Sequence, residues 1–312
     1  MTWPARLHVV TGKGGVGKTT VAAALALALA SGGHRVLLAE VEGRQGLARL
    51  FDLEPLPYEE RRLGDIDADL RLLAVDPEEA LLEYLDLFYK MGRAGRVLRK
   101  LGAIDFATTI APGLRDILLT GKVKETTTRT DQAGNRLYHA VVLDAPPTGR
   151  IGRFLNVTHE AAKLAKLGPV KSQSEGVAAL LRSPMTSVHL VTLLEEMPVQ
   201  ETADALEELA ALHIPVGKII VNHAQPALLS TKVSQAELKR GLVAAGLPAD
   251  RQTVTGLQAE ADAHLARGEV EKRLRHDLAR LGRPLIELPM LSDGVDLAGL
   301  GRLAAVLAAS GG

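Results

Sequence analysis

The sequence feature that most constrains the fold is a glycine-rich segment close to the amino terminus. Residues 12–19 read GKGGVGKT, which matches the pattern G-x-x-x-x-G-K-[ST]. An apolar run, Leu7–Thr11, precedes the segment, and an alanine-rich helical pattern, Val21–Ala30, follows it. A strand, a glycine-rich loop and a helix in this order are typical of a phosphate-binding loop. The alternative is a turn that binds nothing, and the flanking strand and helix disfavour it.

The residue types in this loop suit a nucleotide triphosphate. Glycines let successive backbone N–H groups turn toward a phosphate without a Cβ atom in the way. The helix that follows directs the positive end of its dipole at the anion. Lys18 can reach the β- and γ-phosphates, and the Thr19 hydroxyl can ligate Mg²⁺. We therefore expect a nucleoside triphosphate and Mg²⁺ as cofactors, bound by Gly12, Gly14, Gly15, Val16, Gly17, Lys18, Thr19 and Thr20.

Short apolar runs alternate with helical patterns along the 312 residues. Nearly continuous runs of this kind are expected of parallel strands that are covered on both faces. We predict an α/β fold, a doubly wound and mostly parallel sheet, in a single phosphate-loop domain over residues 1–312. The predicted strands are Leu7–Thr11, Arg35–Val41, Leu70–Val75, His139–Leu143, Ser187–Leu193, Gly217–Val221 and Pro284–Leu288.

Two mostly helical regions look like additions to the sheet. The first, residues 77–128, is predicted to be an insertion subdomain, and the second, residues 226–281, is a helical segment before the last strand. In the first region one helical face carries Leu81, Leu82, Leu85, Phe88 and Tyr89. We interpret that face as intramolecular core, with a groove for cargo as the alternative. In the second region an amphipathic stripe comprises Val270, Leu274, Leu278 and Leu281.

A basic cluster lies within the first helical region, and a last helix is predicted over Asp296–Ala309. We interpret the cluster as a solvated helical face. The alternative interpretation is a surface that binds an acidic partner or lipid headgroups. The last helix carries a single arginine, so we expect it to pack on the sheet rather than lie on a membrane. The cluster comprises Lys90, Arg93, Arg96, Arg99 and Lys100.

Composition excludes several classes of site. The chain contains no cysteine, which rules out disulfides, zinc–thiolate sites and iron–sulfur clusters. Lysine plus arginine and aspartate plus glutamate each total 37, so the net charge is zero and broad nucleic-acid binding is not expected. We see no targeting segment and expect a cytoplasmic protein that can act at the periphery of a membrane.

A second site element follows the apolar strand at 139–143. Asp144 stands at the carboxyl end of that strand, the place of a carboxylate that holds the Mg²⁺ shell beside a phosphate loop. We therefore expect Thr19 and Asp144 to serve the metal. A chance aspartate at a strand end is the alternative.

The loop GKGGVGKTT, residues 12–20, resembles the deviant phosphate loop of one branch of ATPases. That branch includes septum-placement and partition ATPases, the nitrogenase iron protein, and the arsenite-pump and tail-anchored-protein-targeting ATPases. The resemblance implies a nucleotide-sandwich dimer in which Lys13 acts on the partner's nucleotide. The dimer is expected to be a homodimer or a heterodimer with a paralogous ATPase. The alternative is that Lys13 contacts only its own phosphates.

Further stretches are similar to the arsenite-pump and tail-anchored-protein-targeting ATPases. Residues 144–150, DAPPTGR, resemble the family's DTAPTGH switch loop, with Arg150 in place of the histidine. Aligning the second strand and its exit loop places Glu42 at the family's water-orienting aspartate and Gln45 at a histidine. The extra methylene of a glutamate implies slow or partner-dependent hydrolysis. By the same resemblance Asn222 would recognise adenine, and Pro289 and Leu291 would close over the adenosine.

The resemblance implies an ATPase that acts on a membrane-associated or hydrophobic client through a nucleotide-driven dimer switch. The missing cysteines exclude thiol-based arsenite sites and a zinc-stapled dimer. Two alternatives remain open. One is a partition-type positioning ATPase, and the other is a weakly hydrolysing, nucleotide-sensing subunit paired with a paralogue.

Overall fold

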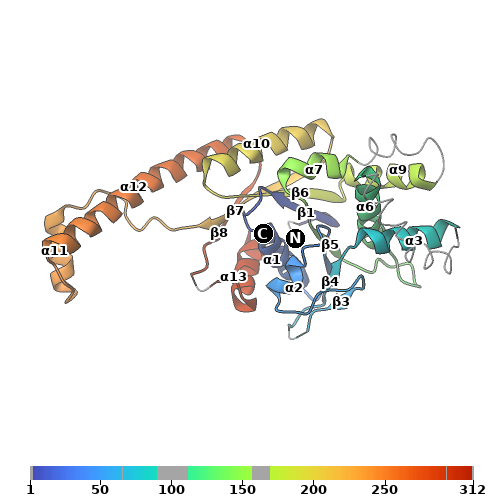
Figure 1. Ribbon diagram of the computed structural model, residues 1–312, viewed down its shortest axis with the longest axis horizontal. Helices are drawn as coiled ribbons and strands as arrows, with labels where there is room; N and C mark the ends of the chain where they lie inside the picture. Colours follow the sequence, from blue (N-terminus) through green and yellow to red (C-terminus); the bar gives the residue numbers. More distant parts are fainter. Residues whose placement is uncertain (1–2, 65, 90–111, 157–168, 293, 311–312) are drawn as a thin grey trace.

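The computed structural model describes residues 3–64, 66–89, 112–156, 169–292 and 294–310. Within these ranges the chain forms an eight-stranded sheet with the order β3-β4-β2-β5-β1-β6-β7-β8. Neighbouring strands in it run parallel except β3 and β4, which are antiparallel. Helices lie on both faces of the sheet (Figure 1). The predicted α/β, doubly wound and mostly parallel architecture is confirmed.

Seven strands lie where the apolar runs predict them, with ends that differ by at most three residues. The sequence does not predict β3, because two exposed arginines at a sheet edge carry no apolar periodicity. The strands are β1 (Leu7–Gly12), β2 (Val36–Glu40), β3 (Arg61–Arg62), β4 (Leu70–Ala74), β5 (Ala140–Asp144), β6 (Thr186–Thr192), β7 (Val216–Ala224) and β8 (Leu285–Pro289).

Different helices cover the two faces of the sheet. One face packs against α1 (Lys18–Ala30), α2 (Gly46–Leu50) and α13 (Leu297–Ala309). As predicted, α13 packs on the body, with Leu300, Leu303 and Leu307 buried. The other face packs against α6 (Pro112–Thr128), α7 (Thr148–Leu155), α9 (Pro169–Leu181), α10 (Glu196–Ala211) and the inner end of α12 (Arg251–Arg280).

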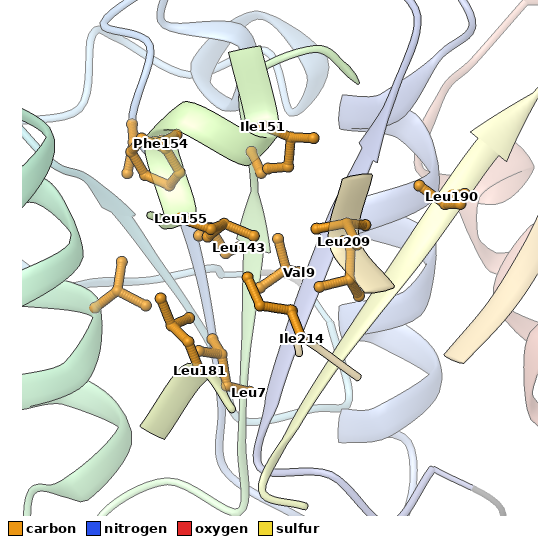
Figure 2. Close-up of a cluster of buried hydrophobic side chains, with 14 of the residues drawn as sticks. Leu7, Val9, Leu143, Ile151, Phe154, Leu155, Leu181, Leu190, Leu209 and Ile214 are labelled. Atoms are coloured by element: carbon orange, nitrogen blue, oxygen red, sulfur yellow. The ribbon is translucent and has the colours of Figure 1, made fainter. Parts of the chain in front are cut away.

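The central strand β1 contributes to both cores. Leu7 and Val9 lie in the core beneath α7, α9 and α10 (Figure 2), whereas Val10 belongs to the core beneath α1 and α13. Successive side chains of a strand point to opposite faces, so all six residues of β1 are buried. A strand that is fixed on both faces also fixes the start of the glycine-rich loop that follows it.

The predicted insertion at 77–128 begins with α3 (Pro77–Tyr89) and ends with α6. Leu81 and Tyr84 of α3 are buried in a small core with Leu118 of α6, so that part of the apolar face is intramolecular. The side chains of Leu85, Phe88 and Tyr89 and the whole basic cluster at 90–100 lie outside the described residues. The insertion subdomain therefore stays a prediction.

α11 (Gln235–Ala244) and α12 form a helical arm that extends away from the sheet (Figure 1). α11 packs against α12, and none of its residues is buried. The predicted stripe divides along α12: Leu274 and Leu278 are buried in the core, but Val270 is 37% exposed. No helix in the described ranges is both long and apolar enough to span a bilayer.

Candidate functional site

The glycine-rich loop connects buried β1 to α1 at the carboxyl edge of the sheet. Gly17 has φ of 87° and ψ of 30°, a left-handed conformation that favours glycine, and it caps α1. A Cβ atom on Gly12 would collide with the carbonyl oxygen of Val191 in β6. Gly14 and Gly15 face open space, with no atom within 4 Å of an added Cβ. The backbone around Gly14 and Gly15 is therefore accessible to an anion.

Lys18 lies over this loop and beside acidic side chains. Its Nζ donates a hydrogen bond of 3.3 Å to the backbone oxygen of Lys13. Burial lowers the pKa of Lys18, and the negative charges of Asp144 and Glu42 oppose that shift. The structure thus brings Lys18 close enough to Asp144 and Glu42 for their charges to interact, although the three residues come from separate segments.

Thr19 and Asp144 are in direct contact, as expected if both serve one metal. The Thr19 hydroxyl donates to Asp144 Oδ2 at 2.6 Å. Asp144 Oδ1 is buried and accepts no hydrogen bond from the described residues. Burial raises the pKa of Asp144 to about 6, against the hydrogen bond from Thr19 and the charge of Lys18. A buried carboxylate oxygen beside a hydroxyl fits the oxygen-only donor set that Mg²⁺ prefers.

Lys13 forms an ion pair within its own chain. Its Nζ contacts Glu201 Oε1 of α10, and Glu201 Oε2 accepts a hydrogen bond of 3.0 Å from the Thr148 hydroxyl. The hydrogen bond from Lys13 is the main reason that the pKa of Glu201 is lowered. These contacts join the phosphate loop, the start of α7 and α10. The expected reach of Lys13 to a partner's nucleotide stays a prediction, and it requires this pair to open.

Glu42 lies between two arginines. Its carboxylate is 3.9 Å from Arg44 Nε and 3.7 Å from Arg150 Nη1. Arg150, which stands where the resemblance has a histidine, therefore links the loop after β2 to the first turn of α7. The hydroxyl of Thr11 in β1 donates to the backbone oxygen of Pro146 at 2.6 Å and so anchors the loop after β5.

Gln45, aligned with the other family histidine, has a structural contact. Its side-chain amide donates to the backbone oxygen of Leu56 at 3.1 Å and accepts from the Leu56 N–H at 2.8 Å. Gln45 itself has φ of 52°, which is uncommon for a residue with a side chain. This two-way contact fixes the loop between Glu42 and α2.

The residues predicted to contact adenosine divide between two places. The buried Asn222 donates from Nδ2 to the backbone oxygen of Val16 at 2.9 Å, and its amide leaves no room for a Cβ on Gly17. Pro289 and Leu291 lie beyond it, at the end of β8 and in the loop that follows. Pro289 pairs with Ala224, and Leu291 packs beside Gly299 of α13. Asn222 thus directly supports the phosphate loop.

Two acids at this site, Glu40 and Glu201, were not predicted from the sequence. Glu40 ends β2 and pairs in register with Asp144 of β5. The sequence contained one signal for Glu40: it is an acid within the apolar run 35–41, where burial of an unpaired charge is costly. Glu201 has no comparable signal, because its contact with Lys13 spans 188 residues. Among the described residues, no group of three or more histidine, aspartate or glutamate side chains is arranged to hold a metal.

Comparison with known proteins identifies the family. A sequence model of the anion-transporting ATPases matches residues 5–178 and 157–241, which together include the phosphate loop, Asp144 and Asn222. The chain belongs to the anion-transporting ATPase family. It is therefore an ATPase, and the resemblance inferred from its loops is confirmed.

Three named relatives differ in how similar they are to this chain: one is about half identical, and two are less than 30% identical. ATPase BagA of Mycobacterium tuberculosis is 51% identical over 99% of this chain and 96% of its own length. ATPase GET3 of Kluyveromyces lactis is 28% identical over 68% of this chain and 70% of its own length. A protein of Aquifex aeolicus named as an arsenical pump-driving ATPase is 26% identical, over 71% and 81% of the two chains.

Proposed function

We propose that this anion-transporting ATPase binds Mg-ATP in the loop 12–19 and uses hydrolysis to switch a dimer between two conformations. Its client would be a membrane-associated or hydrophobic molecule. The observation that supports the proposal most is the proximity of Lys18 and Thr19 to Asp144, next to a glycine loop whose backbone is open. Loops of this kind bind phosphates through backbone N–H groups, so the substrate class follows from the backbone itself.

Each residue then has a defined part in binding. Lys18 leaves the Lys13 carbonyl and neutralises the β- and γ-phosphates, and Asn222 orients the base beside the loop. Thr19 and Asp144 would hold Mg²⁺, which on binding neutralises phosphate charge. The buried Asp144 Oδ1, which lacks a hydrogen-bond donor among the described residues, fits that role. Pro289 and Leu291 would border the adenosine.

Lys13 would provide the link between nucleotide and dimer. Its ammonium is paired with Glu201 in the single chain, and that pair is only partly shielded from solvent. A partly exposed ion pair is worth little free energy, so phosphates of high charge can compete with Glu201 for Lys13. Dimerisation would therefore accompany the replacement of the Lys13–Glu201 ion pair by contacts of Lys13 with the phosphates of the partner's nucleotide.

The contacts of Glu42 favour a second candidate, a nucleotide-sensing subunit that hydrolyses slowly. Two arginines stand on either side of the carboxylate that should orient water, at 3.7 and 3.9 Å. A carboxylate engaged in this way is a weaker acceptor for a water proton. Measured turnover of the isolated chain separates the candidates: rapid hydrolysis without any paralogue contradicts the slow-subunit proposal.

The binding proposal is tested by titrating Mg-ATP into the wild type and into Lys18→Ala by calorimetry. We expect tight binding to the wild type and a loss of at least about 100-fold in the variant, because a desolvated charge pair with phosphate is removed. Lys171→Ala, a change of an exposed lysine in α9, is the matched control. Equal affinities for wild type and Lys18→Ala would contradict the site assignment.

The client proposal has its own test, since ATP binding alone does not define a client. Asp144→Asn protein held in ATP should retain a bound apolar peptide or lipid if the client is hydrophobic. A partition-type role predicts instead ATP-dependent sedimentation with DNA or liposomes. Sedimentation with DNA and no retained apolar molecule would contradict a hydrophobic client.

A further inference from the structure

Glu40 is a buried acid at the nucleotide edge of the sheet that has no assigned role. It is the last residue of β2, only 4% exposed, and lies directly opposite Asp144, the last residue of β5. Adjacent parallel strands therefore bring two carboxylates together at one edge. Burying two like charges side by side is unfavourable unless a cation or hydrogen-bond donors compensate them.

One oxygen of Glu40 has a partner and the other lacks one. Oε2 accepts a hydrogen bond of 2.9 Å from the backbone N–H of Leu47 in α2. Oε1 is buried and receives no hydrogen bond from the described part of the chain. Buried carboxylate oxygens in folded proteins are rarely left without a donor. The unpaired oxygen indicates that a donor arrives with a ligand.

Gly46 lies beside both Glu40 and Thr19. An added Cβ on Gly46 would be 3.4 Å from Glu40 Oε2 and 3.6 Å from Thr19 Oγ1. Glu40 and Thr19 thus border the same small space, which glycine leaves free of side-chain atoms. Thr19 in turn contacts Asp144, whose own Oδ1 also lacks a donor. Three oxygen-bearing side chains, from β2, α1 and β5, therefore lie close together at this edge of the sheet.

Oxygen donors of this kind favour a hydrated divalent cation. Lys18 offers one positive charge to the buried pair of Glu40 and Asp144, and the site must also accept the negative phosphates of ATP. Mg²⁺ usually retains several of its waters in proteins, and those waters donate hydrogen bonds to nearby carboxylates. The Glu40 Oε1 atom, which has no hydrogen-bond donor among the described residues, is suited to accept a hydrogen bond from such a water.

We propose that Glu40 is an outer-shell ligand of Mg²⁺ in this protein, with Oε1 accepting a hydrogen bond from a metal-bound water. The inference rests on the proposed function, because it takes Mg-ATP to occupy the loop 12–19. Oε2 meanwhile holds Leu47, so the occupied metal site is linked to α2 and to the loop that carries Glu42. Glu40 is a positioning residue: it orients water around the metal and does not touch the reacting phosphate.

Electron paramagnetic resonance titration of Mn²⁺ into the ADP-loaded protein tests this proposal without relying on turnover. Glu40→Gln keeps a side-chain oxygen that can accept from the Leu47 N–H but removes the negative charge. We expect the variant to bind Mn²⁺ about 10- to 100-fold more weakly, the usual loss when an outer-shell partner is removed. Its affinity for ADP without metal should not fall, since a negative charge near the phosphates has gone.

Three further variants make the result decisive. Glu196→Gln, at an exposed position of α10, should bind Mn²⁺ as the wild type does. Asp144→Asn should bind it more weakly. Unchanged Mn²⁺ affinity in folded Glu40→Gln, with weakened binding in Asp144→Asn, overturns the inference and leaves the proposed function standing. Unchanged affinity in both variants overturns the metal site itself.

The third variant covers the case in which Glu40→Gln is too unstable to titrate. Glu40→Asp keeps the carboxylate and moves it by one methylene, so we expect only a partial loss of Mn²⁺ affinity. Wild-type affinity would show that the position of the Glu40 carboxylate is irrelevant to the metal and would overturn the proposal.

Discussion

The phosphate-loop edge of the sheet and the α11–α12 arm are built in different ways. At the sheet edge, side chains far apart in sequence meet: Thr19 contacts Asp144, and Asn222 contacts Val16. In the arm, α11 packs against its neighbour α12, and Val243 and Leu247 remain 63% and 55% exposed. The site therefore depends on the register of the whole sheet, whereas the arm depends on local helix formation.

Local signals set the limits of the arm. Ser234 and Glu237 form a reciprocal capping box at the start of α11. The side chain of Asp250 accepts hydrogen bonds from the backbone of Gln252 and Thr253 at the start of α12. Such caps satisfy free N–H groups within one turn and need no long-range partner. Substitutions in the outer arm should consequently affect folding less than substitutions in the sheet.

Two leucines of the same helix give the largest expected contrast. Leu278 is fully buried at the inner end of α12, whereas Leu257 is 39% exposed in its outer part. We expect Leu278→Ala to lower the free energy of unfolding by about 2–5 kcal/mol, because it leaves a cavity in the core. Leu257→Ala should cost less than about 1 kcal/mol. Urea titration measures both, and equal losses would contradict the division of α12.

Two buried histidines of the sheet should make the free energy of unfolding depend on pH. Burial lowers the pKa of His8 to about 4 and that of His189 well below its usual value. An unfolded histidine has a pKa near 6.5, so the unfolded chain binds more protons between pH 6.5 and 4. The free energy of unfolding should therefore fall with decreasing pH in this window, by about 1.4 kcal/mol per unit for His8.

Urea titrations at several pH values measure that slope. The wild type should show a steeper loss of stability than His8→Gln, whose side chain does not titrate. His276→Gln, a change of an exposed histidine in α12, is the matched control. If His8→Gln keeps the wild-type slope, or if His276→Gln has a reduced slope, the assignment of this pH dependence to His8 is contradicted.

The smallest expected effect on stability is at the Lys13–Glu201 pair, although this pair belongs to the site. Glu201→Gln should change the free energy of unfolding by less than about 1 kcal/mol, because both side chains are partly exposed. Under the dimer proposal, the released Lys13 should increase self-association in ATP. Sedimentation velocity measures this, and weaker association in Glu201→Gln would count against Lys13 as the link.

The sequence predicts the parts of the molecule that carry a period or a motif. Continuous apolar runs predict seven of the strands, and the loop at 12–19 with the aspartate at 144 predicts the contact of Thr19 with Asp144. It does not predict β3, which has two residues, or the point where α12 leaves the body. Spacing shows that Val270 and Leu274 share a face, but not that the core ends between them. Contacts such as Gln45 with Leu56 depend on tertiary placement.

The proposed function requires that the loop between β1 and α1 binds a triphosphate, and one crystal structure tests this requirement directly. The crystal should contain the wild-type protein with Mg²⁺ and a non-hydrolysable ATP analogue. We expect the phosphates to lie against the backbone of residues 13–19 and Lys18 to turn from the Lys13 carbonyl to the phosphates. The metal should lie beside Thr19 and Asp144. A nucleotide bound elsewhere, with Thr19 still donating to Asp144, would contradict the proposed function.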